Sequence, residues 1–173
     1  MAERFFDTVI VGGGAAGLSA AVMLKQRCPE LKVGLTEQLE RVGKKISVTG
    51  NGRCNITNLK IEAENYYSGD LEKVIKILDN FDYFKTKEFF STVGVEFAAE
   101  KHKVYPRSFQ ASSVVDALRY STQKLGVDIF PNTKVLDIKR VKTYFEILFD
   151  NKDYNYNTLK AKTVIVATGG LAG

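Results

Sequence analysis

Three glycines, Gly12, Gly14 and Gly17, satisfy the pattern G-x-G-x-x-G at the junction between two dissimilar segments. Before them, Phe6–Val11 is a short β-branched and apolar run, which predicts a strand buried on both faces. After them, Ala15–Gln26 is rich in Ala, Leu and Met, which favour helix. A strand that passes through a glycine turn directly into a helix predicts the start of a βαβ unit, and this constrains the fold more than any other feature.

A second strand is predicted at Lys32–Thr36, and Glu37 stands at its end, twenty positions after Gly17. In a βαβ unit of this kind Gly12 permits the tight turn, Gly14 lets a pyrophosphate approach, and Gly17 allows close packing. The helix N-terminus favours phosphate, and the Glu37 carboxylate suits a ribose diol while repelling a 2′-phosphate, which argues against NADP. The pattern predicts a site for FAD or NAD without separating them. A structural turn with a solvated glutamate is the alternative.

The rest of the chain predicts an α/β fold, a Rossmann-like domain with a parallel sheet, helices and an antiparallel β-meander. Gln38–Asn58 is expected to be a long ordered loop with one short helical turn. Helices are predicted at Leu71–Phe81, Phe84–Thr92 and Ser112–Leu125. Strands are predicted at Val95–Phe97, Lys103–Tyr105, Val127–Phe130, Thr133–Arg140, Tyr144–Asp150 and Asn155–Lys160, and a final buried strand at Thr163–Ala167.

Composition limits the classes of function. The chain has 173 residues, a net charge of +5, two cysteines, Cys28 and Cys54, and one histidine, His102. So few Cys and His side chains argue against a disulfide framework and a metal site, and they suggest a reducing, cytoplasmic location. The apolar stretch Val9–Leu24 is interrupted by glycines and is shorter than a membrane span, so no membrane partner is expected. The basic residues are dispersed, so a nucleic-acid partner is not expected either.

Two further features separate FAD from NAD. The strand Thr163–Ala167 ends in the small residues Thr168-Gly169-Gly170, directly after the predicted meander. The loop after Glu37 contains Gly43-Lys44-Lys45 and then Thr49-Gly50-Asn51-Gly52-Arg53-Cys54-Asn55-Ile56-Thr57-Asn58. That loop resembles the hallmark segment of a family of bacterial NAD(P)/FAD-dependent oxidoreductases, which includes aminoacetone oxidase-like and bile-acid-reductase-like flavoproteins. The segment Val104–Leu118 resembles a second part of the same family.

The resemblance implies a fold like that of glutathione reductase and FAD as the cofactor, with NAD(P)H as a candidate electron donor. It implies an oxidoreductase that moves hydride or electrons to or from a small organic substrate. The cofactor-binding residues that it implies, together with those of the glycine turn, are Gly12, Gly13, Gly14, Ala15, Ala16, Gly17, Glu37, Gln38, Lys45, Thr49, Gly50, Asn51, Gly52, Arg53, Cys54, Val135, Ala167, Thr168 and Gly169.

Members of that family are longer than this chain. We therefore expect residues 1–173 to be the N-terminal portion of an FAD-binding domain, inactive alone, which needs the remainder of its own chain to complete the site. The parts expected to be absent are an inserted substrate domain and a last FAD-binding strand and helix. No catalytic acid or base is predicted.

Several alternatives stay open. Arg53 could neutralise the cofactor or pair with an acid, and Asn51 and Asn55 could bind flavin or simply suit turns with positive φ. Cys54 is expected to be a packed residue, because a redox pair would need a second cysteine nearby. The rival functions are an NAD-binding dehydrogenase domain, a tRNA-modifying flavoprotein, which the pI of about 9.1 permits, and an inactive lobe.

Overall fold

The computed structural model describes residues 4–151 and 153–170. The chain forms two compact units. Unit 1 consists of Met1–Ile46 and Leu118–Gly173, and unit 2 consists of Ser47–Ala117. Unit 1 is therefore built from both ends of the sequence, with unit 2 as the intervening segment.

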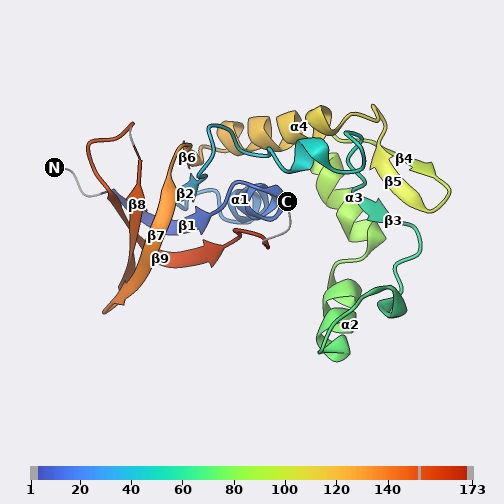
Figure 1. Cartoon of the computed structure of the whole chain (residues 1–173), viewed down its shortest axis with the longest axis horizontal. Coiled ribbons are helices and arrows are strands. Elements are labelled where there is room, and N and C mark those ends of the chain that lie inside the picture. The colour runs from blue at the N-terminus through green and yellow to red at the C-terminus, as the bar shows by residue number, and fades with distance from the viewer. Residues whose placement is uncertain (1–3, 152, 171–173) are drawn as a thin grey trace. The chain divides into compact units, whose positions relative to one another are not determined.

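Unit 1 contains a six-stranded sheet with the strand order β6-β2-β1-β9-β8-β7 (Figure 1). The strands β6, β2, β1 and β9 run parallel, and β8 and β7 pair antiparallel as the predicted meander. In chain order the strands are β1 Phe5–Val11, β2 Val33–Thr36, β6 Asp128–Phe130, β7 Lys134–Val141, β8 Tyr144–Asp150 and β9 Thr158–Val166. This arrangement confirms the predicted α/β fold class with its mixed sheet.

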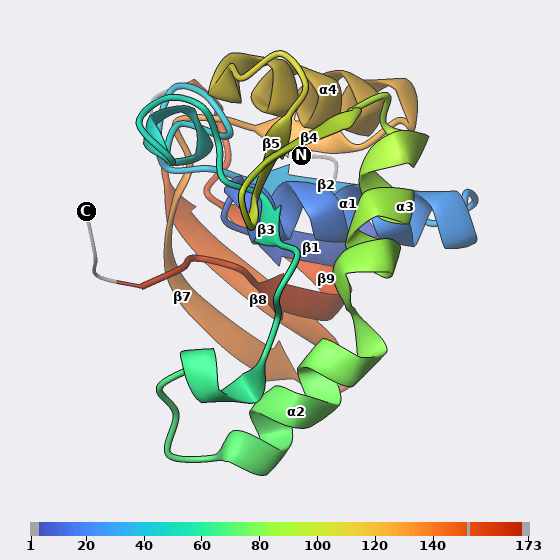
Figure 2. The ribbon, with the colours of Figure 1, turned by 90° about the vertical axis from the view of Figure 1, so that its right-hand side faces the viewer.

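Helix α1, Ala15–Arg27, connects β1 to β2 and contacts both strands. Its buried side includes Leu18, Ala21 and Val22, which are fully enclosed. Figure 2 shows α1 running beside the strands of this sheet. The crossover is the βαβ unit that the glycine pattern predicted, and it places the start of α1 at the carboxyl end of β1.

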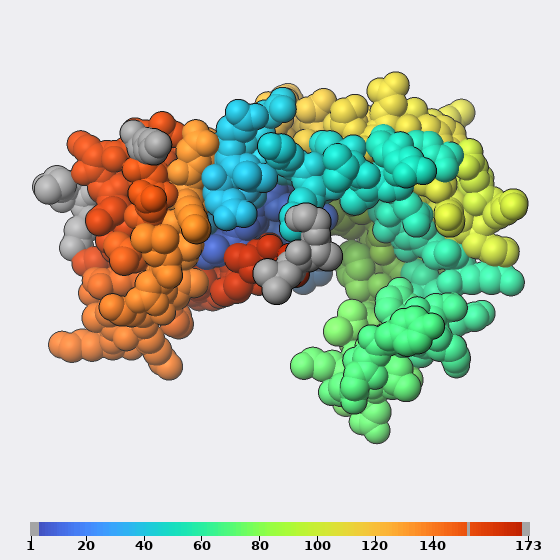
Figure 3. Space-filling view, in the orientation of Figure 1, coloured from blue at the N-terminus to red at the C-terminus, as the bar shows by residue number. Residues whose placement is uncertain are grey.

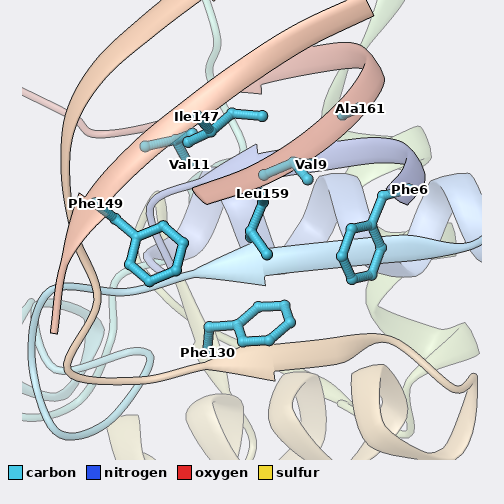
Figure 4. Close-up of a cluster of buried hydrophobic side chains, with 8 residues drawn as sticks. All are labelled: Phe6, Val9, Val11, Phe130, Ile147, Phe149, Leu159 and Ala161. Atoms are coloured by element: carbon cyan, nitrogen blue, oxygen red, sulfur yellow. The ribbon is translucent and has the colours of Figure 1, made fainter. Parts of the chain in front are cut away.

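The core of unit 1 lies between the parallel strands and the meander (Figure 4). Phe6 and Phe130 meet edge to face, with ring centroids 5.8 Å apart. The strands β8 and β9 contribute fully buried aliphatic side chains to the same cluster. Its members are Phe6, Val9, Val11, Phe130, Ile147, Phe149, Leu159 and Ala161.

Unit 2 contains a three-stranded antiparallel sheet with the order β3-β5-β4. An aspartate N-cap precedes each of its helices α2 and α3. The side chains of these residues, Asp70 and Asp82, accept the backbone N–H three residues later. The bounds are β3 Thr57–Asn58, α2 Leu71–Asn80, α3 Tyr83–Thr92, β4 Phe97–Glu100, β5 Lys103–Pro106 and α4 Ala111–Lys124, which crosses the boundary between the units.

Every residue of α2 is at least partly exposed, including its large apolar residues Leu71, Ile75 and Ile77. Figure 3 shows the side chains of α2, in green, at the surface in the orientation of Figure 1. Among the described residues, no helix is both long and apolar enough to cross a bilayer.

Several sequence-based boundaries are wrong. The strand predicted at Val95–Phe97 is β4 at Phe97–Glu100, because Val95 still belongs to the turn that ends α3. The strands predicted at Asn155–Lys160 and Thr163–Ala167 are one strand, β9, because Ala161 is a core residue and carries the strand through two flanking lysines. The carboxyl half of β9 is not buried, and Val166 is 65% exposed, since the pairing of β8 with β9 ends at Ala161.

We expect Ile147→Ala to lower the free energy of unfolding by about 2–4 kcal/mol, since it leaves a cavity in the core of unit 1. Ile147 is fully buried between strands, whereas the adjacent Leu148 is 37% exposed. Leu148→Ala is therefore the matched control and should cost less than half as much. Urea unfolding followed by circular dichroism measures both, and equal losses would contradict this account of the core.

Candidate functional site

The turn between β1 and α1 is held by close backbone approach. Gly12 has φ +108°, and a Cβ atom there would lie 2.5 Å from the carbonyl oxygen of Ala167. A Cβ atom at Gly17 would lie 1.9 Å from the carbonyl oxygen of Gly12. Both distances are far below van der Waals contact, so the turn excludes any side chain at these two positions.

Gly14, in contrast, faces open space. It is the N-cap of α1, and a Cβ atom at this position would meet nothing within 4 Å. No side chain caps the helix, the first turn contains no acidic residue, and Ala15 and Ala16 are exposed. The positive end of the helix dipole is thus left for an anion from outside unit 1.

The Glu37 carboxylate lies against the glycine turn. Its Oε2 accepts the backbone N–H of Gly13 at 2.9 Å, and its Oε1 accepts that of Leu39 at 2.9 Å. A carboxylate oxygen can accept more than one hydrogen bond, so both oxygens keep capacity for a diol. The side chain is half-buried and points toward the turn, as the sequence predicted.

The backbone of Glu37 ties this carboxylate to the meander. Its N–H donates to the carbonyl of Phe130 at 2.9 Å, and its carbonyl accepts the N–H of Thr133 at 2.8 Å. Strand β7 begins at the next residue, Lys134, and its pairing register shifts between Val135 and Asp137 on this edge strand. The edge strand β7, with its irregular backbone, therefore begins next to the residue that bonds Glu37.

The carboxyl end of β9 lies beside the same turn. The N–H of Ala167 donates to the carbonyl of Val11 at 2.8 Å, which continues the pairing between β1 and β9 one residue past the end of β9. Thr168 and Gly169 follow as exposed residues, and Gly169 has φ +74°. Unit 1 thus brings Ala167 to Gly12, while Gly13 meets Glu37.

Two residues that brace the turn were not predicted. The N–H of Gly43 donates to the carbonyl of Gly13 at 2.8 Å, and the side chain of Val42 lies 2.6 Å from where a Cβ of Gly13 would be. Gly43 was visible in the sequence as part of the family-like loop, but Val42 gave no signal. The predicted residues Gln38 and Lys45 are exposed in unit 1.

Unit 2 carries the other predicted residues, Thr49 to Cys54, as a loop with left-handed backbone. φ is +56° at Gly50, +54° at Asn51, +77° at Gly52 and +57° at Cys54. The N–H of Arg53 donates to the carbonyl of Gly50 at 3.1 Å, and that of Cys54 donates to the carbonyl of Thr49 at 2.9 Å. The tip, from Thr49 to Gly52, is exposed.

The polar side chains of this loop contact unit 2 itself. Arg53 donates to Glu100 Oε2 at 2.8 Å, so it takes the acid-paired alternative. With its amide nitrogen facing them, Asn55 donates to the carbonyls of Thr57 at 3.0 Å and Val104 at 3.2 Å. Asn51 has the positive φ that the turn alternative required.

Cys54 is a packed thiol with 6% of its surface exposed. Burial raises the pKa of the Cys54 thiol above its ordinary value of 9.0, and a hydrogen bond with Thr49 offsets this only in part. Because the thiolate is the reactive form, a protonated and buried Cys54 is suited to packing and poorly suited to redox exchange.

Comparisons with known proteins agree with the α/β fold. A family model described as HI0933-like protein Rossmann domain matches residues 6–173. A 3-dehydro-bile acid delta(4,6)-reductase of Clostridium scindens is 37% identical over 94% of this chain and 39% of its own. A ribosomal RNA dihydrouridine synthase of Escherichia coli is 30% identical over 98% of this chain and 40% of its own. This chain thus spans about two fifths of either relative's length.

A solved structure shares the fold. The 3-ketosteroid-delta4-(5alpha)-dehydrogenase of Rhodococcus jostii RHA1 superposes with a TM-score of 0.70 at 15% identity, covering 98% of this chain and 47% of that one.

We expect Gly17→Ala and Gly14→Ala to differ sharply in stability. The added methyl at position 17 would collide with the Gly12 carbonyl and cost about 3 kcal/mol or more. At position 14 it meets open space, so the loss should be no more than about 1 kcal/mol, from the poorer N-cap. Thermal unfolding of the two variants measures this, and equal losses would mean that the turn is not built as described.

We expect the Cys54 thiol to react slowly while the protein is folded. In a Cys28→Ser background, alkylation by iodoacetamide at pH 8, followed by mass spectrometry, should be slower in folded than in urea-unfolded protein. Folding raises the pKa of the Cys54 thiol. The protonated thiol therefore contributes its full stability below about pH 9, and this contribution is lost as the pH rises through the pKa of the folded state. A folded-state rate equal to or above the unfolded one contradicts the assignment.

Proposed function

Because this chain belongs to the HI0933-like Rossmann-domain family, we propose that it is the N-terminal FAD-binding portion of an oxidoreductase that acts on a small organic substrate. Membership confirms the family and the fold class predicted from the sequence, and it supports FAD as the cofactor. Flavoprotein oxidoreductase is the enzyme class that we propose for the whole protein. Hydride or electron transfer to or from the substrate, with NAD(P)H as a candidate donor, is the activity proposed for the whole protein.

The observation that carries this proposal is the pairing of an open, uncapped helix start with a carboxylate. Gly14 leaves space where a pyrophosphate would approach α1, and Glu37 lies one hydrogen bond from the adjacent Gly13. The diphosphate is an anion suited to the helix start, and the ribose is a diol suited to the carboxylate, so the two sites match two of the three parts of adenosine diphosphate. The residues present therefore fit the adenosine half of FAD.

Further residues of unit 1 support the same assignment. We assign adenine to the backbone of Val135, because β7 is an edge strand whose pairing is interrupted there. Ala167 to Gly169 follow the central strand β9, and their small side chains allow a cofactor to pass close to the backbone. Gln38 and Lys45 complete the set proposed for this unit.

In unit 2, we assign the loop Thr49 to Cys54 to the pyrophosphate and flavin end of the cofactor, on the strength of the family resemblance. The flavin supplies the redox chemistry when it is bound, and the protein supplies binding and orientation. Both units are proposed to belong to the N-terminal portion of one FAD-binding domain. Two free cysteines, Cys28 and Cys54, support a reducing compartment, the cytoplasm.

A second candidate is a flavoprotein that acts on RNA. One relative is a ribosomal RNA dihydrouridine synthase, and the net charge here is +5. Unit 1 carries the whole basic excess, because unit 2 has one more acidic residue than basic ones. Binding of ribosomal RNA that weakens steeply with salt would favour this candidate over a small-molecule substrate. The two proposed functions share the same FAD site and differ only in the substrate.

We expect Gly14→Ala to reduce the affinity for FAD about tenfold or more, which corresponds to about 1.4 kcal/mol, while the protein stays folded. The methyl group would occupy the space that the pyrophosphate needs. Gly69→Ala is the matched control, since its added Cβ also meets nothing within 4 Å, and it should bind FAD normally.

Flavin fluorescence of the purified natural protein, titrated with FAD after removal of its cofactor, measures these affinities. Release of a nicotinamide nucleotide in place of flavin would contradict the proposal, as would Gly14→Ala binding FAD as tightly as the unmodified protein.

A further inference from the structure

Arg53 makes three contacts with the β4–β5 hairpin of unit 2. Its Nη1 lies 2.8 Å from Glu100 Oε2, its Nη2 donates to the Tyr105 hydroxyl at 3.3 Å, and its Cζ lies 4.5 Å from the centre of the Tyr105 ring. The planar guanidinium thus combines an ion pair, a hydrogen bond and a cation–π contact on two partners. We call Arg53, Glu100 and Tyr105 the Arg53 clamp.

Of the two partners of Arg53, Tyr105 is buried and Glu100 is exposed. Tyr105 is only 3% exposed, and its ring lies 5.8 Å from that of Phe109. Tyr105 is on β5 opposite Ala98, and Glu100 is the last residue of β4, opposite Lys103. The clamp therefore reaches across both strands of the hairpin, so the side chain of Arg53 is anchored on a folded element.

The backbone at Arg53 is the part of the loop that needs such an anchor. Arg53 lies between Gly52 and Cys54, both with left-handed φ, and Asn51 is left-handed as well. Left-handed backbone at residues other than glycine costs about 1 kcal/mol each, so the loop conformation must be stabilised from outside. Two contacts from outside the loop supply such support: the hydrogen bond from the Ala111 N–H to the Gly52 carbonyl, and the Arg53 clamp.

We propose that Arg53 is a positioning residue that holds the loop Thr49–Cys54 in its left-handed conformation, and is not itself a ligand of the cofactor. The inference rests on the proposed function, in which this loop contacts FAD. With its positive charge engaged by Glu100, Arg53 acts on the cofactor through the backbone of Gly50, Asn51 and Gly52, which are exposed at the tip. The sequence alone favoured the opposite role, a direct contact between Arg53 and the cofactor.

Hydrogen exchange of loop amides tests the clamp without any cofactor. The reporters are the N–H groups of Arg53 and Cys54, which donate within the loop, and that of Ala111, which donates to the Gly52 carbonyl at 2.7 Å. Arg53→Lys keeps the charge but loses the planar fork and the stacking, and should speed their exchange about tenfold. Glu100→Gln removes only the ion pair and should speed it about two- to fivefold.

Glu88→Gln is the matched control, because Glu88 is an exposed acid on α3 of the same unit and its loss changes the net charge equally. This variant should leave all three reporter amides unchanged. If neither Arg53→Lys nor Glu100→Gln speeds their exchange relative to Glu88→Gln, the clamp does not hold the loop and the inference is overturned.

The direction in which Glu100→Gln changes the affinity for FAD then distinguishes a positioning role of Arg53 from a direct contact. If Arg53 positions the loop, Glu100→Gln weakens FAD binding about two- to fivefold, because the loop is less ordered. If Arg53 were a ligand competing for the cofactor with Glu100, the same variant would free its charge and bind FAD equally or more tightly, which would overturn the inference. A natural protein that binds no flavin would contradict the proposed function, and the exchange data would still decide on the clamp.

Discussion

The candidate site depends on the close approach of three backbone segments at Gly12. The end of β1, the start of α1 and the residue after β9 come so near that neither Gly12 nor Gly17 has room for a Cβ. Because rigid main chain makes these contacts, the first turn of α1 has one position relative to the sheet. The dipole of the helix and the free N–H groups of its first turn are then directed at a fixed point, which is what an anion site requires.

Glu37 adds an electrostatic constraint to this geometric one. Its carboxylate bonds the N–H of Gly13, which removes that donor from phosphate binding and places a negative charge beside the turn. Phosphate is therefore favoured on the side of Gly14 and Ala15, and hydroxyl groups are favoured on the side of Glu37. The main-chain hydrogen bonds of Glu37 with Phe130 and Thr133 also fix its position relative to the segment that leads into β7. In the proposed site, this one acidic side chain favours a single orientation of the cofactor, because it accepts hydrogen bonds from hydroxyl groups and repels phosphate.

Local sequence signals predicted the fold well where the chain is regular. The βαβ unit, α1 to α4 and the meander strand Tyr144–Asp150 follow from hydrophobic period and glycine placement, since those patterns report directly on burial. The joining of two predicted strands into β9 was missed, because Lys160 and Lys162 break the apolar pattern while Ala161 between them stays in the core.

For the candidate site, the contact between the glycine turn and Glu37 was predictable, because a glycine turn and its acid have a defined spacing. The role of Val42 was not, since a bracing contact depends on how a long loop returns to the turn. The partner of Arg53 was also beyond the sequence, because Glu100 lies 47 positions away and pairs only once the β4–β5 hairpin has formed.

The discontinuous construction of unit 1 bears on how the chain reaches its native state during synthesis. Strand β1 pairs with β9, and Asp7 contacts Lys162 across 155 positions of sequence. Closing so large a loop is slow, and the parallel pairing cannot begin until β9 has left the ribosome. The glycine turn is synthesised early, but Ala167, which packs against Gly12, is synthesised near the end of this segment. A nascent chain can therefore form α1 and the β4–β5 hairpin of unit 2 first, and the proposed nucleotide site is complete only after β9 has docked.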